Sequence, residues 1–263
     1  TALCEKAGED GYKPEYLAAT GVCIQKDDGT LVDKFRERAM FPIHTVSGRI
    51  IGFGGRTLRS DYKERNIGKY VNSPQTEVYD KKTTLYGIYF AKSEIARRDR
   101  CILVEGYLDV LSMHQLGITN VVASSGTSLT VEQVSLIRKF TENVTIMYDG
   151  DAAGIHAAER GIGLCRKGGL NVRVVLIPDG DDPDSFARKH TLEEVKSFIE
   201  ENERDFISYR TDQLIGDAGS DPVRRSNLVN EIAGTLALIP DQVKRAMYVQ
   251  DVSVKFNIDE SLV

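Results

Sequence analysis

Short apolar runs alternate with amphipathic segments in the middle of the chain. The apolar runs cover residues 101–105, 121–125 and 143–148, and segments with apolar residues at helical spacing lie between them. Runs of this length are typical of buried strands, and the periodic segments are typical of helices. Strands separated by single helices form right-handed crossovers in a parallel sheet. The pattern predicts an α/β domain with a mainly parallel sheet flanked by helices, and residues 172–177 add a fourth strand.

Local signals predict where some of these helices begin and end. Gly117 closes a helix over residues 107–116, because glycine is common just after a helix C-terminus. Thr130 and Gln133 have the spacing of a capping box that opens the next helix. In the first helix we expect three residues to face the sheet: Leu108, Leu111 and Leu116.

The segments on either side have a different character. Residues 39–43 and 49–53 are short β-type runs around Ser47-Gly48, which predicts a hairpin. From residue 191 onward the pattern is helical, and Asp221-Pro222 is a helix start. We therefore expect three parts: a mixed α/β basic subdomain at 1–100, a catalytic α/β domain at 101–190 and a helical subdomain at 191–263.

Acidic residues follow the predicted strands. Glu105 ends the first strand, and Asp149 and Asp151 follow the third. Ligands of parallel sheets gather beyond the carboxyl ends of the strands, so these carboxylates should converge there. A further acidic group follows the fourth strand and consists of Asp179, Asp181, Asp182 and Asp184. Because oxygen ligands favour Mg²⁺ or Mn²⁺, the pattern predicts a divalent-metal site for phosphate chemistry. Each feature taken alone is also ordinary turn chemistry.

Composition and charge refine this prediction. The chain has 263 residues, 41% of them hydrophobic, and a net charge of -5. Residues 34–100 nevertheless hold fifteen Lys and Arg against seven Asp and Glu, so a basic region precedes the acidic edge. A surface that binds phosphates beside one that binds cations suits a polymerase. No apolar run is long enough to span a membrane.

The cysteines and the chain ends also bear on the class of protein. Cys4, Cys23, Cys101 and Cys165 are far apart and form no C-x-x-C pair, which argues against zinc and favours a reducing cytosol. The chain has no initiator Met and begins within a predicted helix, so we expect it to be a fragment of a longer protein.

At these residues the chain resembles a known family. Glu105 at one strand end and Asp149-Gly-Asp151 at a later one form the pattern of the Toprim domain, which primases, topoisomerases, recombination mediators and some nucleases share. Longer motifs are similar to those of bacterial replicative primases of the DnaG type: residues 104–110, 123–127, 148–154 and 178–184, and upstream residues 35–43, 52–56 and 69–74.

This resemblance implies roles for particular residues. It implies that two or more Mg²⁺ or Mn²⁺ ions are held by Glu105, Asp149, Asp151, Asp182 and Asp184, with Glu105, Asp149 and Asp151 as the catalytic residues and Asp109 in support. It also implies that template phosphates or the incoming triphosphate contact Arg36, Arg56, Lys69, Asn72 and Lys81. Physics alone does not say which of the eleven basic residues in 34–82 point toward the ligand. For Glu105 itself we expect metal binding rather than general-base catalysis.

The implied activity is RNA primer synthesis for DNA replication. Ribonucleoside triphosphates would be joined on single-stranded DNA, with release of pyrophosphate and an RNA primer as product. The resemblance implies a cytoplasmic, nucleoid-associated bacterial protein that contacts the replicative helicase through a module absent from this chain. It implies that the zinc-binding module is absent as well. The alternatives are a Toprim topoisomerase or nuclease, and a Toprim module that binds DNA without catalysis. None of the eleven tyrosines is marked as a topoisomerase nucleophile.

Overall fold

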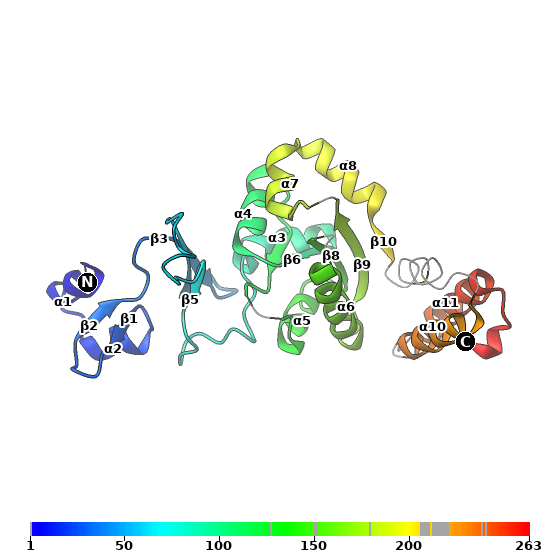
Figure 1. Ribbon diagram of the computed structural model, residues 1–263, viewed down its shortest axis with the longest axis horizontal. Helices are drawn as coiled ribbons and strands as arrows, with labels where there is room; N and C mark the ends of the chain where they lie inside the picture. The colour runs from blue at the N-terminus through cyan, green and yellow to red at the C-terminus, as the bar shows by residue number, and fades with distance from the viewer. Residues whose placement is uncertain are drawn as a thin grey trace. The chain divides into compact units, whose positions relative to one another are not determined.

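The structure is a computed structural model that describes residues 2–126, 128–149, 152–178, 180–205, 211, 221–237, 239 and 241–263, without the side chains of 152–159. Contacts divide the chain into two compact units, Thr1–Phe90 and Ala91–Val263 (Figure 1). The boundary between the units lies in helix α3 (Ile88–Arg98). The division into three domains at residues 100 and 190 stays a prediction.

The first unit begins with two helices and a small two-stranded sheet. Helices α1 (Ala2–Glu9) and α2 (Pro14–Ala19) precede the antiparallel strands β1 (Cys23–Gln25) and β2 (Leu31–Asp33). The Asp33 carboxylate accepts hydrogen bonds from the backbone N–H groups of Leu3 and Cys4, at 3.0 and 2.9 Å, and so caps α1. A disulfide joins Cys4 to Cys23, a pairing that their separation in the sequence did not predict.

The predicted hairpin is confirmed in the same unit. Strands β3 (Arg38–His44) and β4 (Ile50–Thr57) pair antiparallel, and β5 (Tyr70–Asn72) pairs with β4. The turn requires Gly48, whose φ is 93° and whose missing Cβ would lie 2.6 Å from the Tyr89 ring. A larger residue would therefore be strained and would also clash.

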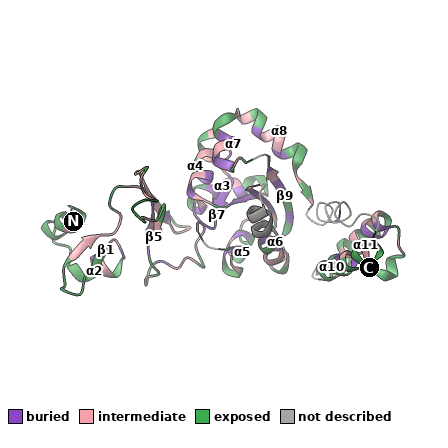
Figure 2. Cartoon of the chain, viewed as in Figure 1, coloured by how far each residue is buried: buried purple, intermediate pink, exposed green. Residues whose placement is uncertain are grey.

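A five-stranded sheet forms the centre of the second unit. Its order is β10-β9-β8-β6-β7. Four strands are parallel, namely β6 (Cys101–Val104), β7 (Val121–Ala123), β8 (Asn143–Asp149) and β9 (Asn171–Ile177), while the short β10 (Arg204–Asp205) is antiparallel to β9. All residues of β6 and β7 are buried, as the continuous apolar runs predicted for a sheet covered on both faces (Figure 2).

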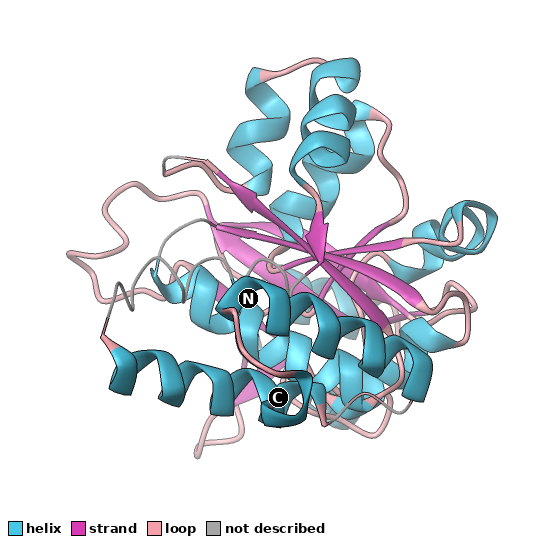
Figure 3. Ribbon diagram, turned by 90° about the vertical axis from the view of Figure 1, so that its right-hand side faces the viewer, coloured by secondary structure: helices cyan, strands magenta, loops and turns pink. Residues whose placement is uncertain are grey.

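Helices cover both faces of this sheet (Figure 3). They are α4 (Tyr107–Leu116), α5 (Val131–Arg138), α6 (Ala152–Lys167), α7 (Pro183–Lys189) and α8 (Leu192–Asn202). The strand order and right-handed crossovers place α4 on one face and α5 and α6 on the other. Contacts of α4 with α7, and of α5 with α6, agree with this arrangement. The predicted α/β class with a mainly parallel sheet is confirmed.

The predicted helix ends are confirmed, but one predicted helix face is wrong. Gly117 is the left-handed C-cap of α4, and Thr130 and Gln133 form the capping box of α5. In α4, however, Leu111 is 42% exposed, and the side of the helix that is buried includes Val110 and Met113. The three leucines share a helical spacing, yet helix packing against α7 as well as the sheet selected a different stripe.

The last part of the second unit is a helical hairpin. Helices α10 (Pro222–Leu236) and α11 (Gln242–Phe256) precede a 3₁₀ turn, η1 (Glu260–Leu262), and share a small apolar core. Asp221 caps α10, as its position before Pro222 predicted. Among the described residues, no helix is both long enough and apolar enough to cross a membrane.

We expect Glu203 to stabilise the end of the sheet at which the parallel strands begin. Its Oε1 lies 2.6 Å from Arg100 and accepts from the Thr145 hydroxyl at 2.5 Å, while its Oε2 lies 3.1 Å from Arg173. Glu203→Ala should lower the free energy of unfolding by about 1–3 kcal/mol, because it leaves these donors without their acceptor. Urea denaturation measures this loss. The exposed Glu201→Ala is the control, and equal losses in both variants would contradict the role.

Candidate active site

The carboxyl ends of the parallel strands bring several of the predicted acidic residues to one edge. Glu105 directly follows β6, and Asp149 is the last residue of β8. Asp182 and Asp184 lie at the start of α7, which follows β9. Asp151 and Asp179 fall outside the described residues. The structure thus places four of the five predicted ligands at the predicted edge.

Asp109 lies at the centre of the acidic group. Its side chain is on the first turn of α4 and only 8% exposed, and its Oδ2 accepts the Gly106 N–H at 2.7 Å. Burial raises the pKa of Asp109 to about 6, and repulsion from Asp182, Asp149 and Asp184 adds to this shift. Three carboxylates therefore lie near enough to Asp109 to repel its charged form. The sequence analysis gave Asp109 only a supporting role.

Helix α7 holds its two acidic residues in different ways. The buried Asp184 accepts from the Ser112 hydroxyl at 2.5 Å and from Arg188 at 2.8 Å, which ties α7 to α4. Asp182 caps α7 by accepting the Ser185 N–H at 2.7 Å, and its side chain is exposed. Asp181 forms an ion pair with Lys189 at 2.5 Å, so it already has a cationic partner.

Glu105 belongs to a neighbouring cavity. This cavity of about 390 Å³ is lined by polar side chains and glycines together with Leu129 and Leu164; among the polar residues are Glu105, Ser124, Ser128, Tyr148 and Arg160. Burial raises the pKa of Tyr148, and the nearby Glu105 raises it further. The Ser125 N–H donates to the Glu105 carbonyl at 3.1 Å, from a backbone with φ of 54°. Such a left-handed, non-glycine conformation is often found at binding sites.

Ser125 lies between two residues that line this cavity, Ser124 and Gly126. The Ser125 side chain is 7% exposed, and its Oγ has no hydrogen-bond partner within the described residues. A buried hydroxyl without a partner favours a ligand or water that accepts from it. Thr127, in the same motif of residues 123–127, lies outside the described residues.

The predicted phosphate-binding residues lie in the first unit. Arg56 and Asn72 share one face of its three-stranded sheet, because Arg56 is opposite Tyr70 and Asn72 is opposite Gly54. Arg36 and Lys69 are exposed. Lys81 lies near Lys34, whose pKa is lowered first by burial and then by repulsion from Lys81.

Other basic residues of this unit bind within it. Arg59 forms ion pairs with Glu37 and Asp61, both at 2.9 Å. Arg38 donates to the backbone carbonyls of Gly55 and Lys69. Among the described residues, no ion pair within 4.0 Å involves the side chains of Arg36, Arg56 or Lys69. Among the described residues, the structure therefore separates cations that are paired within the unit from cations that have no such ion pair.

The acidic edge fits a divalent cation by the chemistry of its donors. All its predicted ligands are oxygens, which Mg²⁺ and Mn²⁺ prefer. Repulsion among Asp109, Asp149, Asp182 and Asp184 is the condition that a bound cation relieves. In the part of the chain that the structure describes, one group of three ligand atoms lies within 4.8 Å, and it consists of Cys4, Cys23 and Asp33. Its two sulfurs are joined in the disulfide, so they are not thiolate ligands.

Sequence reasoning missed several residues of the site. Ser112 lies on α4 one turn after Asp109, a spacing that places both on one helix face. Arg188 follows Asp184 by four residues, so this ion pair had a signal in the sequence. Tyr148 and Arg160 carried no signal in the sequence, and only the packing of β8 and α6 shows that they line the cavity.

Comparison with known families first defines the class of protein. A family model described as Toprim-like matches residues 102–187. Residues 1–92 match the N-terminal domain of the DNA primase catalytic core. Residues 207–261 match the DnaB-helicase binding domain of primase. This last match corrects the prediction that helicase contact resides only in a module absent from the chain, since we had assigned no function to the terminal helices.

Individual relatives narrow the class further. The chain is 38% identical over 255 residues to a DNA primase of Clostridium acetobutylicum, covering 96% of this chain and 41% of that protein. It is 34% identical to a DnaG primase catalytic domain bound to ssDNA, with a TM-score of 0.86 and coverage of 98% and 81%. The E. coli primase catalytic core is 35% identical, with a TM-score of 0.84 and coverage of 96% and 81%. The chain belongs to the DnaG-type primase family.

We expect Asp109 to make stability depend on pH in metal-free buffer. Its folded pKa is raised to about 6 from 3.8, so the stabilisation it contributes is present below about pH 4 and lost as pH rises through 6. Asp109→Asn keeps the acceptor for Gly106 but removes the charge. The variant should therefore gain stability relative to the wild type between pH 4 and 7.

Denaturant unfolding with EDTA, at a series of pH values, measures this difference. The exposed Glu132→Gln on α5 is the control and should follow the wild type. A stability difference between Asp109→Asn and the wild type that does not change with pH would rule out the buried, repelled carboxylate.

Proposed function

We propose that this chain is the RNA-synthesising core of a primase, which joins ribonucleoside triphosphates on a single-stranded DNA template. The convergence of Asp109, Asp149, Asp182 and Asp184 at the carboxyl edge of a Toprim sheet is the observation that supports it most strongly. The chain spans 41% of the length of its C. acetobutylicum relative, so the activity of the whole protein is part of this proposal.

The acidic residues would hold Mg²⁺ or Mn²⁺, two or more ions, through Glu105, Asp149, Asp151, Asp182 and Asp184. When bound, such ions stabilise negative charge on phosphoryl oxygens. Asp109 positions the group, since its carboxylate is fixed by Gly106. The Ser112 hydroxyl and Arg188 orient Asp184 in the same way. Asp109 and Asp184 are thus held in place before substrate arrives, which reduces the cost of ordering the site.

The cavity beside Glu105 suits the triphosphate of the incoming nucleotide. Arg160 supplies a cation, and Ser124 and Ser128 supply hydroxyl donors along its wall. The reaction joins the 3′-oxygen of one nucleotide to the α-phosphorus of the next and releases pyrophosphate. In this arrangement Glu105 is a ligand and not the base, so the hydroxyl proton passes to water.

The basic residues of the first unit are proposed to bind nucleic acid. Arg36, Arg56, Lys69, Asn72 and Lys81 would contact template phosphates or the triphosphate, and positively charged side chains there attract both. The DnaG catalytic domain bound to ssDNA, to which this chain is similar, supports a single-stranded template. Residues 207–261, which match a helicase-binding family, are proposed to contact the replicative helicase. A cytoplasmic, nucleoid-associated location follows from this role.

The alternatives are less well supported. A topoisomerase or nuclease would share the Toprim sheet, but the primase-specific families match residues 1–92 and 207–261, on either side of it. A module that binds DNA without catalysis has no need for a buried carboxylate such as Asp109 beside three others that repel it, since this repulsion lowers stability unless a cation is bound.

The decisive experiment incubates the chain with a single-stranded template, Mn²⁺ and labelled ribonucleotides. We expect short RNA products, and Asp149→Asn should reduce their yield by about a hundredfold or more, because it removes a charged ligand. Glu132→Gln is the matched control. Mn²⁺ should also raise the thermal unfolding midpoint of the wild type and not that of Asp149→Asn.

The two measurements separate the metal site from the activity. An equal rise in midpoint for both proteins would refute Asp149 as a ligand. If the wild type binds Mn²⁺ but makes no RNA on any template, the proposed activity fails while the metal site stands.

We expect Lys81→Ala to flatten the salt dependence of template binding. Loss of one phosphate contact on a single strand should reduce the slope of log K against log salt by about 0.7. Lys6→Ala is the control, because Lys6 lies on α1 and pairs with Asp10 at 2.9 Å. Fluorescence anisotropy with an oligothymidylate gives both slopes. Identical slopes in the wild type and Lys81→Ala would place the template elsewhere.

A further inference from the structure

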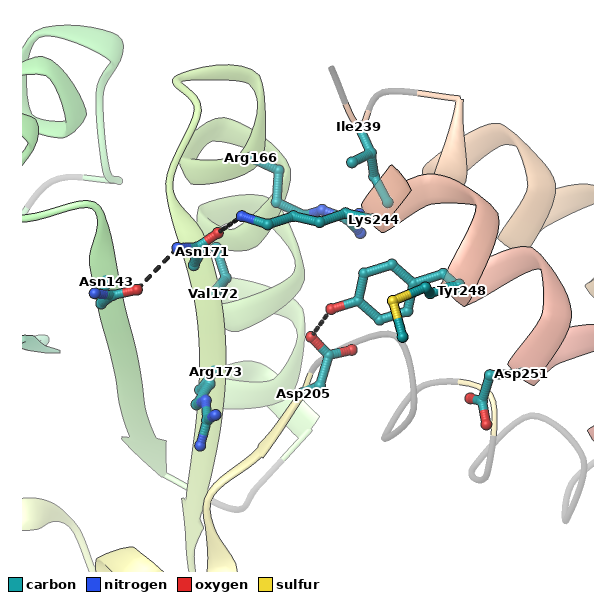
Figure 4. A pocket seen from close by; sticks show the side chains of 11 residues that line it. Asn143, Arg166, Asn171, Val172, Arg173, Asp205, Ile239, Lys244, Tyr248 and Asp251 are labelled. Carbon is teal, nitrogen blue, oxygen red and sulfur yellow. Dashed lines mark hydrogen bonds between the residues drawn. The ribbon is translucent and has the colours of Figure 1, made fainter. Parts of the chain in front are cut away.

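A second cavity lies at the opposite end of the parallel sheet from the acidic edge. It has a volume of about 530 Å³ and is lined by residues of β8, β9, β10, α6 and α11 (Figure 4). Asn143 and Asn171, which begin β8 and β9, form part of its wall. Because parallel strands run from this end toward the carboxylates, the cavity is separate from the site described above.

Two hydrogen-bonded links define the walls of this cavity. Lys244 on α11 donates to the Asn171 side chain at 2.8 Å, and Asn171 donates to Asn143 at 2.8 Å. Tyr248, one turn further along α11, donates to Asp205 at 2.5 Å. Figure 4 shows both links reaching from the helix to the sheet. The helical hairpin is thereby attached to the sheet through polar contacts that leave a space between them.

Arg166 lines this cavity, and one of its guanidinium nitrogens has no hydrogen-bond acceptor among the described residues. Its guanidinium nitrogen Nη1 is buried and has no hydrogen-bond partner among the described residues. Burial lowers the pKa of Arg166, while the nearby Asp205 opposes that shift. The Asp205 carboxylate, however, already accepts from Tyr248. A buried guanidinium N–H without an acceptor favours an anion that supplies one.

The remaining charges around the cavity are largely paired with each other. Arg173 lies 3.1 Å from Glu203, and Asp251 lies 3.3 Å from Lys255, although the Asp251 Oδ2 accepts no hydrogen bond among the described residues. Lys244 donates to a neutral amide and not to a carboxylate. Two cations, on Arg166 and Lys244, are therefore available to an anion inside a chain whose net charge is -5.

The size and the apolar lining of the cavity exceed what a bare ion requires. Val172, Ile239 and Met247 line it together with the Tyr248 ring. A volume of about 530 Å³ is in the range of small-molecule sites. Phosphate matches a guanidinium bidentately, and a planar ring matches aromatic and apolar side chains. From these features we propose that the cavity binds a nucleoside monophosphate, with its phosphate on Arg166 and Lys244 and its ring against Tyr248 and Met247.

Binding at this place would also affect how the helical hairpin is held. The ligand would contact α6 and α11 at once, so it would stabilise their contact beside the existing polar links. This inference does not depend on the proposed polymerase activity, because it concerns other residues and requires no divalent metal.

The test uses AMP, adenosine and inorganic phosphate as probes, in EDTA so that the acidic edge holds no metal. The full chain is labelled with ¹³C at the methionine methyl groups, and Met247→Leu assigns the signal of Met247. AMP should shift the Met247 signal saturably at up to millimolar concentration and leave the buried Met113 unchanged. Adenosine lacks the anion, so its Kd should be at least about tenfold higher than that of AMP.

Two charge-removing variants and a matched control locate the phosphate. Arg166→Gln and Lys244→Gln should each raise the Kd for AMP by about tenfold. Lys167→Gln removes the same charge from the exposed residue next to Arg166 and should leave the Kd unchanged. Circular dichroism verifies folding. If Arg166→Gln does not fold, Lys244→Gln alone decides, because Lys244 is exposed on α11.

Several results would overturn the proposal. They are the absence of a saturable Met247 shift, equal affinity for adenosine and AMP, and an unchanged Kd in Lys244→Gln. Binding of inorganic phosphate as tight as that of AMP would overturn the role of the ring. A single-stranded oligothymidylate that shifts Met247 at lower concentration than AMP would overturn the assignment to a small molecule in favour of a nucleic-acid strand.

Discussion

The burial of the parallel sheet on both faces is the constraint on which the second unit depends. Strands β6 and β7 are buried at every residue, so no polar side chain can be accommodated along them without a partner. Polar chemistry is therefore confined to the ends of the strands. At the carboxyl ends, Glu105 and Asp149 emerge from the apolar layer next to the first turns of α4 and α7. The acidic group is a direct consequence of how the sheet is covered.

The acidic residues are held close together by contacts that do not involve the sheet. The Gly106 N–H fixes Asp109, and the Ser112 hydroxyl joins α4 to Asp184 on α7. These bonds oppose the repulsion that raises the pKa of Asp109. The repulsion at Asp109 lowers the stability of the fold when no cation is bound. The packing of α4 on α7 holds the carboxylates together nonetheless. Such destabilisation is typical of sites that bind a charged ligand.

The opposite end of the sheet, where the parallel strands begin, carries a different set of polar contacts. There Arg100, Thr145 and Arg173 meet the carboxylate of Glu203 after α8. This network is internally paired, in contrast to the acidic edge. Beside it, the contact between the sheet and α11 is polar, and one buried N–H of Arg166 has no acceptor in the part of the chain that the structure describes. The two ends therefore differ in their chemistry: carboxylates gather at one end, and the other presents a buried guanidinium N–H that has no acceptor among the described residues.

The sequence by itself determined the order of strands and helices, the hairpin around Gly48 and the caps at Thr130 and Asp221, because each depends on local spacing and backbone preferences. It also placed Glu105 and Asp149 at one edge, because parallel strands share a direction. Only the tertiary structure decided that Asp109 and Asp184 are buried at that edge, and that Val110 and Met113, not Leu111, are buried on α4. It alone joined Cys4 to Cys23 and brought Arg166 near Asp205. These contacts connect segments distant in the chain, and packing between elements, which has no local signal, determines them.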